Sequence, residues 1–414
     1  MVHASGTRRV VVTGLGAVTP IGQNVEELWA GVHAGKSGVS PLENFPLDDL
    51  KILIGAQIKG FDPKVRLKNF KRDKIIVHAD RYSWFAAAAA EEAVMQSGLQ
   101  VPFEQPYRTA CIIGSGAGGL TTFENAYRDL FLRNKRATNP LTLLRIIGSS
   151  ASAHVGIEYG VKGPTFATCS ACSTATHAIG IARDYIQHNL VDVAIAGAGE
   201  AVINYGTMKA WQALHVLSPT GCYPFSKKRN GTVLAEGAGI LVLEELEHAR
   251  RRGAKILAEI VGYGMTSDSK DMVNPDIEGP REAMRLALQD AKLPPMKIDY
   301  LNAHGTATTI NDKNETNAIK DLFGKHAYNL AISSTKSMHG HPLGAGGGIE
   351  AALCIKAMEE GWVPPTTGLD EPDPDCDLDY VPNVGRAMKV NYTMSNSFAF
   401  GGLNAVLVFG PPPA

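Results

Sequence analysis

The sequence predicts an α/β protein made of two related lobes. Short apolar segments typical of buried strands alternate with segments of helical periodicity through both halves of the 414 residues, as in sheets covered by helices. A chain of this length also exceeds the usual size of a single domain. The segment 255–264 loosely repeats the first strand and turn of the chain. We therefore expect one lobe over residues 1–254 and a second over residues 255–414.

The first half carries signals of strands, helices and one notable loop. Each expected strand is a short apolar run, and the runs lie at residues 9–14, 110–114, 191–197 and 238–244. An amphipathic helix is expected from about Asn24, because the apolar residues of the next turns fall on one face. Further helices are expected over residues 82–98 and 244–253. The glycine-rich loop 115–119 permits a close approach of backbone to a neighbouring group.

The second half repeats the alternation of strands and helices. Strands are expected at residues 255–264, 300–303, 330–333 and 405–409. Helices are expected at residues 279–293, 311–322 and 344–358. The segment Asn396–Asn404, rich in glycine and polar residues, is expected to be a flexible loop before the last strand.

Composition narrows the class of protein and its partners. A net charge of −1 gives no global attraction to nucleic acid or to a membrane surface. No apolar run is long enough to span a bilayer, and the N-terminus lacks the apolar core of a signal peptide. Six cysteines without a framework spacing indicate a reducing compartment. We therefore expect a cytoplasmic protein that binds neither nucleic acid nor membranes.

The stretch around Cys172 is the centre of the functional hypothesis. The approach Gly163–Ala167 has the character of a buried strand that ends in a tight turn, and helical periodicity begins after Cys172. This places the thiol at a helix N-terminus, where free backbone N–H groups and the helix dipole favour a thiolate. Cys172 is therefore a candidate nucleophile. The imidazole of His177 lies five residues further, about 140° round the helix, and is expected to be structural.

A structural, a redox or a metal-binding role for Cys172 is also compatible with this stretch of sequence. A free cysteine is among the most buried residue types and is more often structural than reactive. Cys169 and Cys172 form a C-x-x-C pair, which suits a redox site or half of a zinc site. The other four cysteines are scattered singly, so a second pair of zinc ligands is lacking.

The second half supplies acid–base groups at three strand–helix junctions. His304 follows one expected strand, Lys336 and His341 follow the next, and a glycine-flanked aromatic loop around Phe400 precedes the last. Ligands gather at the carboxyl ends of strands in open α/β sheets. This set of groups at equivalent junctions, namely a thiol, two imidazoles, a lysine and an aromatic loop, suits acyl transfer through a thioester. The imidazoles could donate hydrogen bonds to a carbonyl oxygen as negative charge builds on it.

These motifs resemble the elongating β-ketoacyl–acyl carrier protein synthases, the condensing enzymes of type II fatty-acid synthesis. The matching stretches, which occur in the family's order, are residues 168–180, 302–306, 334–337, 340–341, 396–398 and 400–402. The likeness runs from Arg9 to Phe409. It implies the thiolase fold, in which two α/β lobes with mixed five-stranded sheets form αβαβα layers.

The resemblance also implies a role for each matching residue. Cys172 would accept the acyl group, and His304 and His341 would bind the malonyl thioester and assist its decarboxylation. Lys336 would polarise the histidine site, and the backbone N–H groups of Cys172 and Phe400 would form a second oxyanion hole. The other implied site residues are Glu315 and Glu350 as ionic partners, Thr306 and Thr308 beside phosphopantetheine, and Ala117, Trp211, Phe398 and Ala399 in the acyl pocket.

Partners and cofactors follow from the same resemblance. Acyl carrier protein would bring the substrates on its phosphopantetheine, and no metal or other cofactor is expected. The enzyme is expected to be a homodimer or a heterodimer with a related subunit. A basic segment of the chain could be an ordinary solvent-exposed charged face, but an acidic carrier protein favours its interpretation as a docking site. The expected docking residues are Lys64, Arg66, Lys68, Lys71, Arg72 and Lys74.

Several positions depart from the family pattern and leave the acyl chain length and the pathway open. They are Ala399 in place of glycine, Leu403 in place of threonine, Asp271 in place of histidine, Ala117 in place of a larger aliphatic residue, Trp211 in place of phenylalanine, and His339 as an unusual neighbour of His341. One alternative is a ketosynthase of a specialised polyketide or lipid pathway. Another is a non-catalytic chain-length-controlling subunit, which the intact Cys172 disfavours, since such subunits typically lose the nucleophile.

Overall fold

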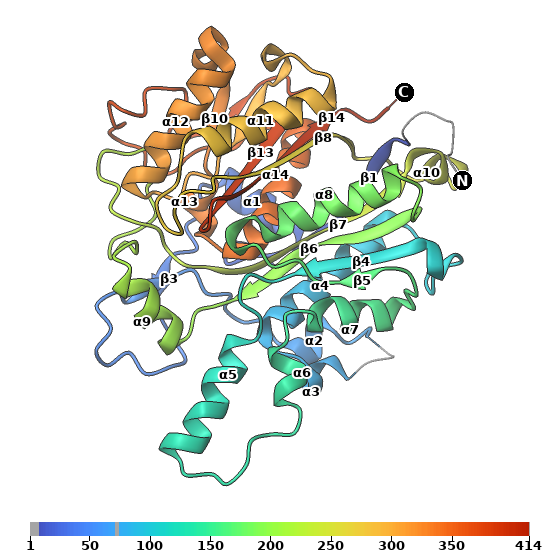
Figure 1. Cartoon of the computed structure of the whole chain (residues 1–414), viewed down its shortest axis with the longest axis vertical. Helices are drawn as coiled ribbons and strands as arrows, with labels where there is room; N and C mark the ends of the chain where they lie inside the picture. Colours follow the sequence, from blue (N-terminus) through green and yellow to red (C-terminus); the bar gives the residue numbers. More distant parts are fainter. Residues whose placement is uncertain (1–7, 71–73, 414) are drawn as a thin grey trace.

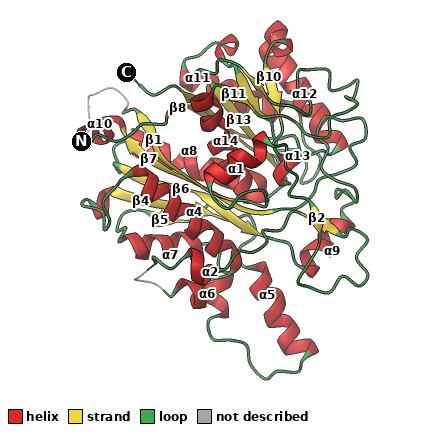
Figure 2. Cartoon of the chain, turned by 180° about the vertical axis from the view of Figure 1, so that it is seen from behind, coloured by secondary structure: helices red, strands yellow, loops and turns green. Residues whose placement is uncertain are grey.

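The computed structural model describes residues 8–70 and 74–413 and shows five layers of helix and sheet. Helices α8 (Thr174–Gln187) and α14 (Gly346–Glu360) lie in the middle, between the two halves of one long, twisted sheet (Figure 1). Helix α4 (Arg81–Ser97) covers the outer face of one half, and α11 (Glu278–Ala291) covers that of the other. The view from behind shows the same layers (Figure 2). The expected α/β class with two lobes is confirmed.

The main sheet has its strands in an order that places the two lobes side by side. Only Val11–Glu259 and Val12–Ala258 pair across the middle, where β1 meets β8. From one edge to the other the strands are β10 (Ala331–Ser333), β9 (Tyr300–Asn302), β13 (Thr393–Ala399), β14 (Leu403–Gly410), β8 (Ala258–Ser267), β1 (Val10–Val18), β7 (Glu236–Glu245), β6 (Val193–Ala201), β4 (Thr109–Gly114) and β5 (Thr165–Phe166). Two small sheets pair β2 (Ser40–Pro41) with β3 (Ile54–Gly55) and β11 (Trp362–Val363) with β12 (Arg386–Ala387).

The strand pairing shows that the second lobe repeats the first. In the first lobe β1–β7 and β7–β6 are antiparallel, whereas β6–β4 and β4–β5 are parallel. In the second lobe β8–β14 and β14–β13 are antiparallel, whereas β13–β9 and β9–β10 are parallel. The central helices correspond as well, since α8 follows β5 and α14 follows β10. The exact boundary between residues 254 and 255 stays a prediction.

Local sequence explains where the helices begin, end and pack. Asn24 caps the first turn of α1 (Val25–His33) by accepting from the backbone N–H of Glu27 at 2.8 Å. Gly98 ends α4 in the left-handed conformation with φ of 67°. The glycine at residue 16 allows α4 to lie directly on β1, because a Cβ there would come 1.8 Å from the carbonyl oxygen of Ala89.

The remaining helical segments connect the strands or project from the body. They are α2 (Pro63–Arg66), α3 (Ile75–His78), α5 (Leu120–Tyr127), α6 (Thr142–Ile146), α7 (Ser150–Tyr159), α9 (Tyr205–Ala213), α10 (Leu246–Arg251), α12 (Thr309–Phe323), α13 (Lys336–His339), the π-helical turn η2 (Arg128–Leu132), and the 3₁₀ turns η1 (Pro106–Arg108), η3 (Ala171–Ser173), η4 (Pro295–Lys297), η5 (Gly324–Tyr328) and η6 (Leu343–Ala345). Within residues 8–70 and 74–413, no helix is both long and apolar enough to cross a membrane.

Two expectations about local structure were wrong. The approach to Cys172 forms β5, but this strand lies at the edge of the sheet and Thr165 is exposed rather than buried. The segment expected to be a flexible loop before the last strand is mostly the hairpin of β13 and β14, in which Phe398 pairs with Asn404. Only residues 400–402 form its turn.

Candidate active site

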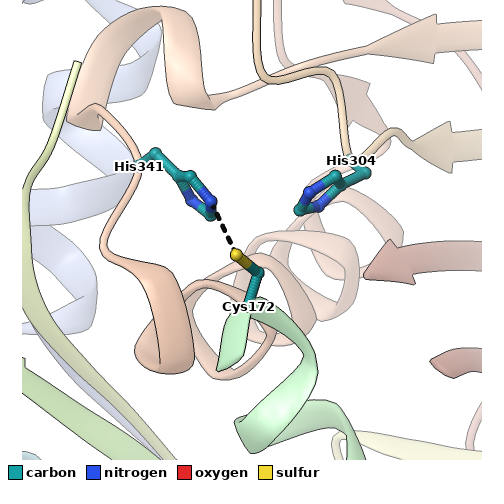
Figure 3. Close-up of side chains that lie close together, drawn as sticks. All are labelled: Cys172, His304 and His341. Carbon is teal, nitrogen blue, oxygen red and sulfur yellow. Dashed lines mark hydrogen bonds between the residues drawn. The ribbon is translucent and has the colours of Figure 1, made fainter. Parts of the chain in front are cut away.

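The site lies where equivalent strand–helix junctions of the two lobes meet. Cys172 is in η3, between β5 and the start of α8. His341 occupies the corresponding connection of the second lobe, between β10 and α14, and His304 follows β9. Figure 3 shows the three side chains converging from these separate segments. The repeat of the fold therefore brings Cys172 together with two histidines that lie more than 100 positions further along the chain.

The three side chains are in close contact and are almost completely buried. The Nε2 atom of His341 lies 3.1 Å from the Sγ atom of Cys172 (Figure 3). The rings of His304 and His341 are 5.4 Å apart between centroids and nearly perpendicular, at 85°. One side-chain atom of each residue lies within 4.8 Å of the others. A carbonyl group beside the sulfur would thus meet both imidazoles.

Burial controls the protonation of Cys172. It raises the pKa of the thiol to about 12, and this outweighs the charge of Lys336 and the backbone N–H of Phe400, which lower the pKa. The expectation of a thiolate favoured by a helix N-terminus was therefore wrong: α8 begins only at Thr174, and desolvation dominates. This pKa favours the thiol over the thiolate, and its sulfur is hydrogen-bonded to Nε2 of His341 at 3.1 Å.

Both histidines are neutral for a related reason. Burial, followed by the positive charge of Lys336, holds the pKa of His304 and of His341 well below the usual value of 6.5. Each ring can therefore accept a proton at one nitrogen and donate from the other. Neutral imidazoles of this kind suit proton transfer from a thiol and hydrogen bonding to a carbonyl oxygen.

Two buried carboxylates hold the segments that carry these groups. Glu350 of α14 forms an ion pair with Lys336, and both side chains are 1% exposed. Glu315 of α12 accepts from the backbone N–H of His304 at 2.8 Å, from that of Gly305 at 2.8 Å and from the amide of Asn396 at 3.1 Å. The predicted ionic partners therefore lie beside the site, with Glu315 fixing the His304 loop.

A cavity of about 360 Å³ opens onto Cys172, His304 and His341. The predicted substrate-binding residues that line it are Thr306, Thr308, Trp211, Phe398 and Ala399, together with Phe400. Trp211 stacks on Phe400 with 5.5 Å between ring centroids. Ala117 is absent from this lining and instead packs on the apolar cluster that contains Cys172.

Neighbouring residues singled out in the sequence have other contacts. The Nδ1 atom of His177 lies 2.8 Å from the hydroxyl of Ser170 and 3.1 Å from the carbonyl oxygen of Ser173, away from the thiol. Cys169 is exposed, and its thiol donates to the carbonyl oxygen of Gly116 at 3.6 Å. His339 is buried beside Thr335, 3.1 Å from its hydroxyl. Asp271 lies in the cavity wall.

The predicted docking residues that the structure describes lie on α2, just after it, and at Lys74 immediately before α3. Lys64, Lys68 and Lys74 are exposed, and the ion pairs of the described residues do not include any of them. Arg66 is half-buried and donates to the carbonyl oxygen of Gln23 at 2.8 Å. Lys71 and Arg72 lie outside the residues that the structure describes.

Sequence reasoning missed two parts of the site. The segment 268–275 forms one wall of the cavity, where the carbonyl oxygen of Met272 accepts from the N–H of Gly401 at 2.9 Å. A polar loop after a strand was the available signal for it. The other is Glu200, a fully buried carboxyl group at the end of β6. An acidic residue inside an otherwise apolar strand was the signal there.

Comparisons with known proteins agree with this architecture. The model of the β-ketoacyl synthase N-terminal domain matches residues 7–249, and that of the C-terminal domain matches residues 257–370. Nodulation protein E of Rhizobium meliloti (strain 1021) is 45% identical over 402 residues, which cover 97% of this chain and 99% of the relative. The 3-oxoacyl-[acyl-carrier-protein] synthase 2 of Coxiella burnetii is 42% identical over 411 residues, with 97% and 98% covered.

A solved structure provides a further comparison. It is a complex of a type II PKS acyl-carrier protein with its ketosynthase bound to the hexaketide. The two folds match with a TM-score of 0.89 at 33% identity, over 98% of this chain and 99% of the other.

Proposed function

The chain belongs to the β-ketoacyl synthase family and is a condensing enzyme, and on this premise we propose that Cys172 carries the acyl group while His304 and His341 activate the malonyl unit. The observation that carries the assignment is the convergence of the three side chains, with His341 Nε2 at 3.1 Å from the sulfur. Their separate segments meet only in the folded chain, at the floor of one cavity.

The first half-reaction transfers an acyl group to the enzyme. The sulfur of Cys172 attacks the thioester carbonyl of the acyl carrier while its proton passes to Nε2 of His341. The C–S bond to phosphopantetheine breaks, and the leaving thiolate takes up that proton. The backbone N–H groups of Cys172 and Phe400 stabilise the tetrahedral oxyanion, a role supported by their position beside the sulfur.

The second half-reaction forms the new carbon–carbon bond. Malonyl carrier binds with its thioester oxygen between the two imidazoles, and the bond to its carboxylate breaks to release CO₂. The electron pair left behind forms an enolate, whose carbon attacks the acyl thioester of Cys172. The C–S bond breaks and releases the Cys172 thiolate, which takes a proton from water, and the product is a β-ketoacyl carrier two carbons longer. Burial, and after it the charge of Lys336, lowers the pKa of both imidazoles and so favours their neutral form.

The proposed partners are acyl carrier protein and a second copy of the chain. The exposed Lys64, Lys68 and Lys74, on and near α2 and before α3, supply positive charge for an acidic carrier. Phosphopantetheine would pass Thr306 and Thr308 in the cavity wall. Dimer formation is supported by the apolar arm of α5, η2 and α6, where Phe131 and Leu143 are each 69% exposed. A related subunit in place of the second copy is the alternative.

The proposal needs no cofactor other than the phosphopantetheine of the carrier. Cys172, His304 and His341 are close enough to hold a metal ion, but the charge of Lys336, which lowers the pKa of both histidines, also disfavours a second cation nearby. The absence of a metal and the cytoplasmic location both stay predictions.

Labelling with a radioactive acyl carrier tests the assignment. We expect the wild type to acquire label and Cys172→Ala to acquire none, because the alanine removes the acyl acceptor. Cys169→Ala is the matched control, since it removes the exposed neighbouring thiol and should label normally. Label retained by Cys172→Ala would show that the nucleophile is assigned wrongly.

The same assay separates the histidines. His304→Ala should retain acylation and lose decarboxylation of malonyl carrier. His341→Ala should be slowed in both steps, because His341, rather than His304, is the histidine hydrogen-bonded to the sulfur. A His304→Ala variant that fails in acylation alone would contradict this division of roles.

A specialised polyketide or lipid pathway is the second candidate, and it is supported by the similarity to the ketosynthase bound to a hexaketide. A ketosynthase of such a pathway would catalyse the same condensation as a fatty-acid enzyme but on a different acyl chain. A non-catalytic subunit is disfavoured, because Cys172 and both histidines are in contact distance.

A further inference from the structure

Glu200 is a buried carboxyl group that takes no part in the two half-reactions. It lies at the end of β6 and is 0% exposed. Its Oε1 accepts from the hydroxyl of Ser115 at 2.8 Å, and its Oε2 accepts from the backbone N–H of Gly116 at 2.8 Å and from that of Gly344 at 3.1 Å. One carboxyl group thus joins a loop of the first lobe to a loop of the second.

Both loops lie directly against the reacting groups. The loop of Gly116 packs on the nucleophile turn, because the N–H of Ser115 donates to the carbonyl oxygen of Thr168 at 3.3 Å. Gly344 belongs to η6, which begins two residues after His341. The hydrogen bonds of Glu200 therefore link the segment that carries Cys172 to the segment that carries His341.

Gly116 and Gly344 leave just enough room for these hydrogen bonds to Glu200. A Cβ on Gly116 would lie 2.8 Å from Oε2 of Glu200, and a Cβ on Gly344 would lie 2.7 Å from the same oxygen. The Gly344 Cβ would also come 2.6 Å from the backbone nitrogen of Gly116. Any larger residue at position 344 would push the two loops apart.

We propose that Glu200 is a positioning residue, whose hydrogen bonds to Gly116 and Gly344 hold His341 in contact with the Cys172 sulfur. The proposal rests on the proposed role of Cys172 as the nucleophile. Because the resting thiol is protonated, its reactivity depends on transfer of the proton to His341, and a shift of that ring by an ångström would be costly.

Alkylation of Cys172 by iodoacetamide tests the proposal without any carrier substrate. The full chain is studied in a Cys169→Ser background, which removes the exposed thiol, and the modified residue is identified by peptide mass spectrometry. Glu200→Ala should slow alkylation by about 10- to 100-fold, the scale of a misplaced general base. Glu200→Gln should stay within about threefold of the parent, because its amide oxygen can still accept from both backbone N–H groups.

Glu92 provides the matched control. Its carboxyl group also joins two segments, by accepting from the N–H of Val25 at 2.7 Å and from that of Ala17 at 3.0 Å, and burial raises the pKa of both Glu92 and Glu200 to about 7. Glu92 has no bond to the loops of Cys172 and His341. Glu92→Ala should therefore leave the alkylation rate within about twofold of the parent, since general-base assistance is untouched.

Gly344→Ala disturbs the same hydrogen bonds at the Gly344 end and should slow alkylation as Glu200→Ala does. It keeps the test decisive if Glu200→Ala does not fold. Parental alkylation rates in both folded variants, or an equal loss in Glu92→Ala or in Glu200→Gln, would overturn the proposal. Absence of acyl labelling in the parent, with these alkylation differences intact, would instead contradict the proposed function.

Discussion

The neutral state of His304 and His341 has a consequence for the pH dependence of the reaction. Two independent histidines with the ordinary pKa of about 6.5 would both be neutral in only about a quarter of the molecules at pH 6.5. Burial and the charge of Lys336 lower both pKa values, so loss of the neutral pair begins only at more acidic pH. Protonation would remove the acceptor that His341 offers to Cys172.

We therefore predict that acylation of Cys172 at pH 6.5 keeps more than about three quarters of its maximal rate, because few histidines are protonated there. The rate should fall only as the pH drops well below that value. The measurement is the initial rate at which a radioactive acyl carrier labels the protein between pH 5 and 8, with thermal melts as the control for folding. A midpoint near pH 6.5 in folded protein would contradict the neutral pair.

Single residues also show what sequence can and cannot predict. The position of His177 followed from helix geometry, and the structure places its ring on Ser170 and Ser173 as that geometry requires. The protonation of Cys172 did not follow, because its pKa depends on burial by segments from the other lobe. Glu200 was overlooked for the same reason, since two of its three partners are backbone groups of distant loops.

At the scale of the element, the stack of Trp211 on Phe400 controls one wall of the cavity. Trp211 comes from α9, Phe400 from the turn after β13, and the indole also borders a second, apolar groove lined by α5 and η2. The ring therefore separates the reaction cavity from that groove. Removing it should connect the two spaces.

Trp211→Ala is thus expected to extend the range of acyl chains that are elongated by about two to four carbons, since each buried CH₂ gains about 0.8 kcal/mol. The measurement is the condensation rate over a series of acyl carriers, and Leu214→Ala on the same cavity wall is the control. An unchanged chain-length profile in Trp211→Ala would show that the ring does not limit the pocket. The wild-type profile also separates the fatty-acid and polyketide candidates.

Elements were predicted well where their side chains reflect one environment. The alanine-rich α4 was expected within one residue of its observed bounds, whereas β1, expected over residues 9–14, continues to Val18. By contrast, β13 was mistaken for a loop because Ser395, Asn396 and Ser397 are polar. In the fold all three residues are buried in the sheet, where the hydroxyl of Ser397 lies 2.7 Å from that of Thr176 and the amide of Asn396 donates to Glu315 at 3.1 Å.

At the scale of the whole molecule, the repeated lobe explains why the site forms between α8 and α14. Each central helix begins at an equivalent junction, so the nucleophile of one lobe faces the histidine of the other. The alternation of strands and helices predicted two lobes. The order of the strands in the sheet could not be predicted, because sequence periodicity does not indicate which strands pair with each other.

The basic segment of residues 64–74 would act at the scale of the whole molecule, through the surface charge. Lys64→Glu, Lys68→Glu and Lys74→Glu together should raise the KM for acyl carrier protein by about 10-fold or more at low salt, since they replace attraction by repulsion. The kcat at saturating carrier should stay unchanged, because the cavity is not altered. The difference from wild type should shrink as salt screens the charges.

A second triple variant separates docking from general charge. Lys292, Lys297 and Lys389 are exposed on the second lobe, so reversing them changes the net charge equally without touching the segment of residues 64–74. This control should leave the KM for the carrier within about twofold, whereas acylation from a short pantetheine thioester should be normal in both variants. Equal effects of the two triple reversals would exclude a docking role for the basic segment and leave it as a solvated face.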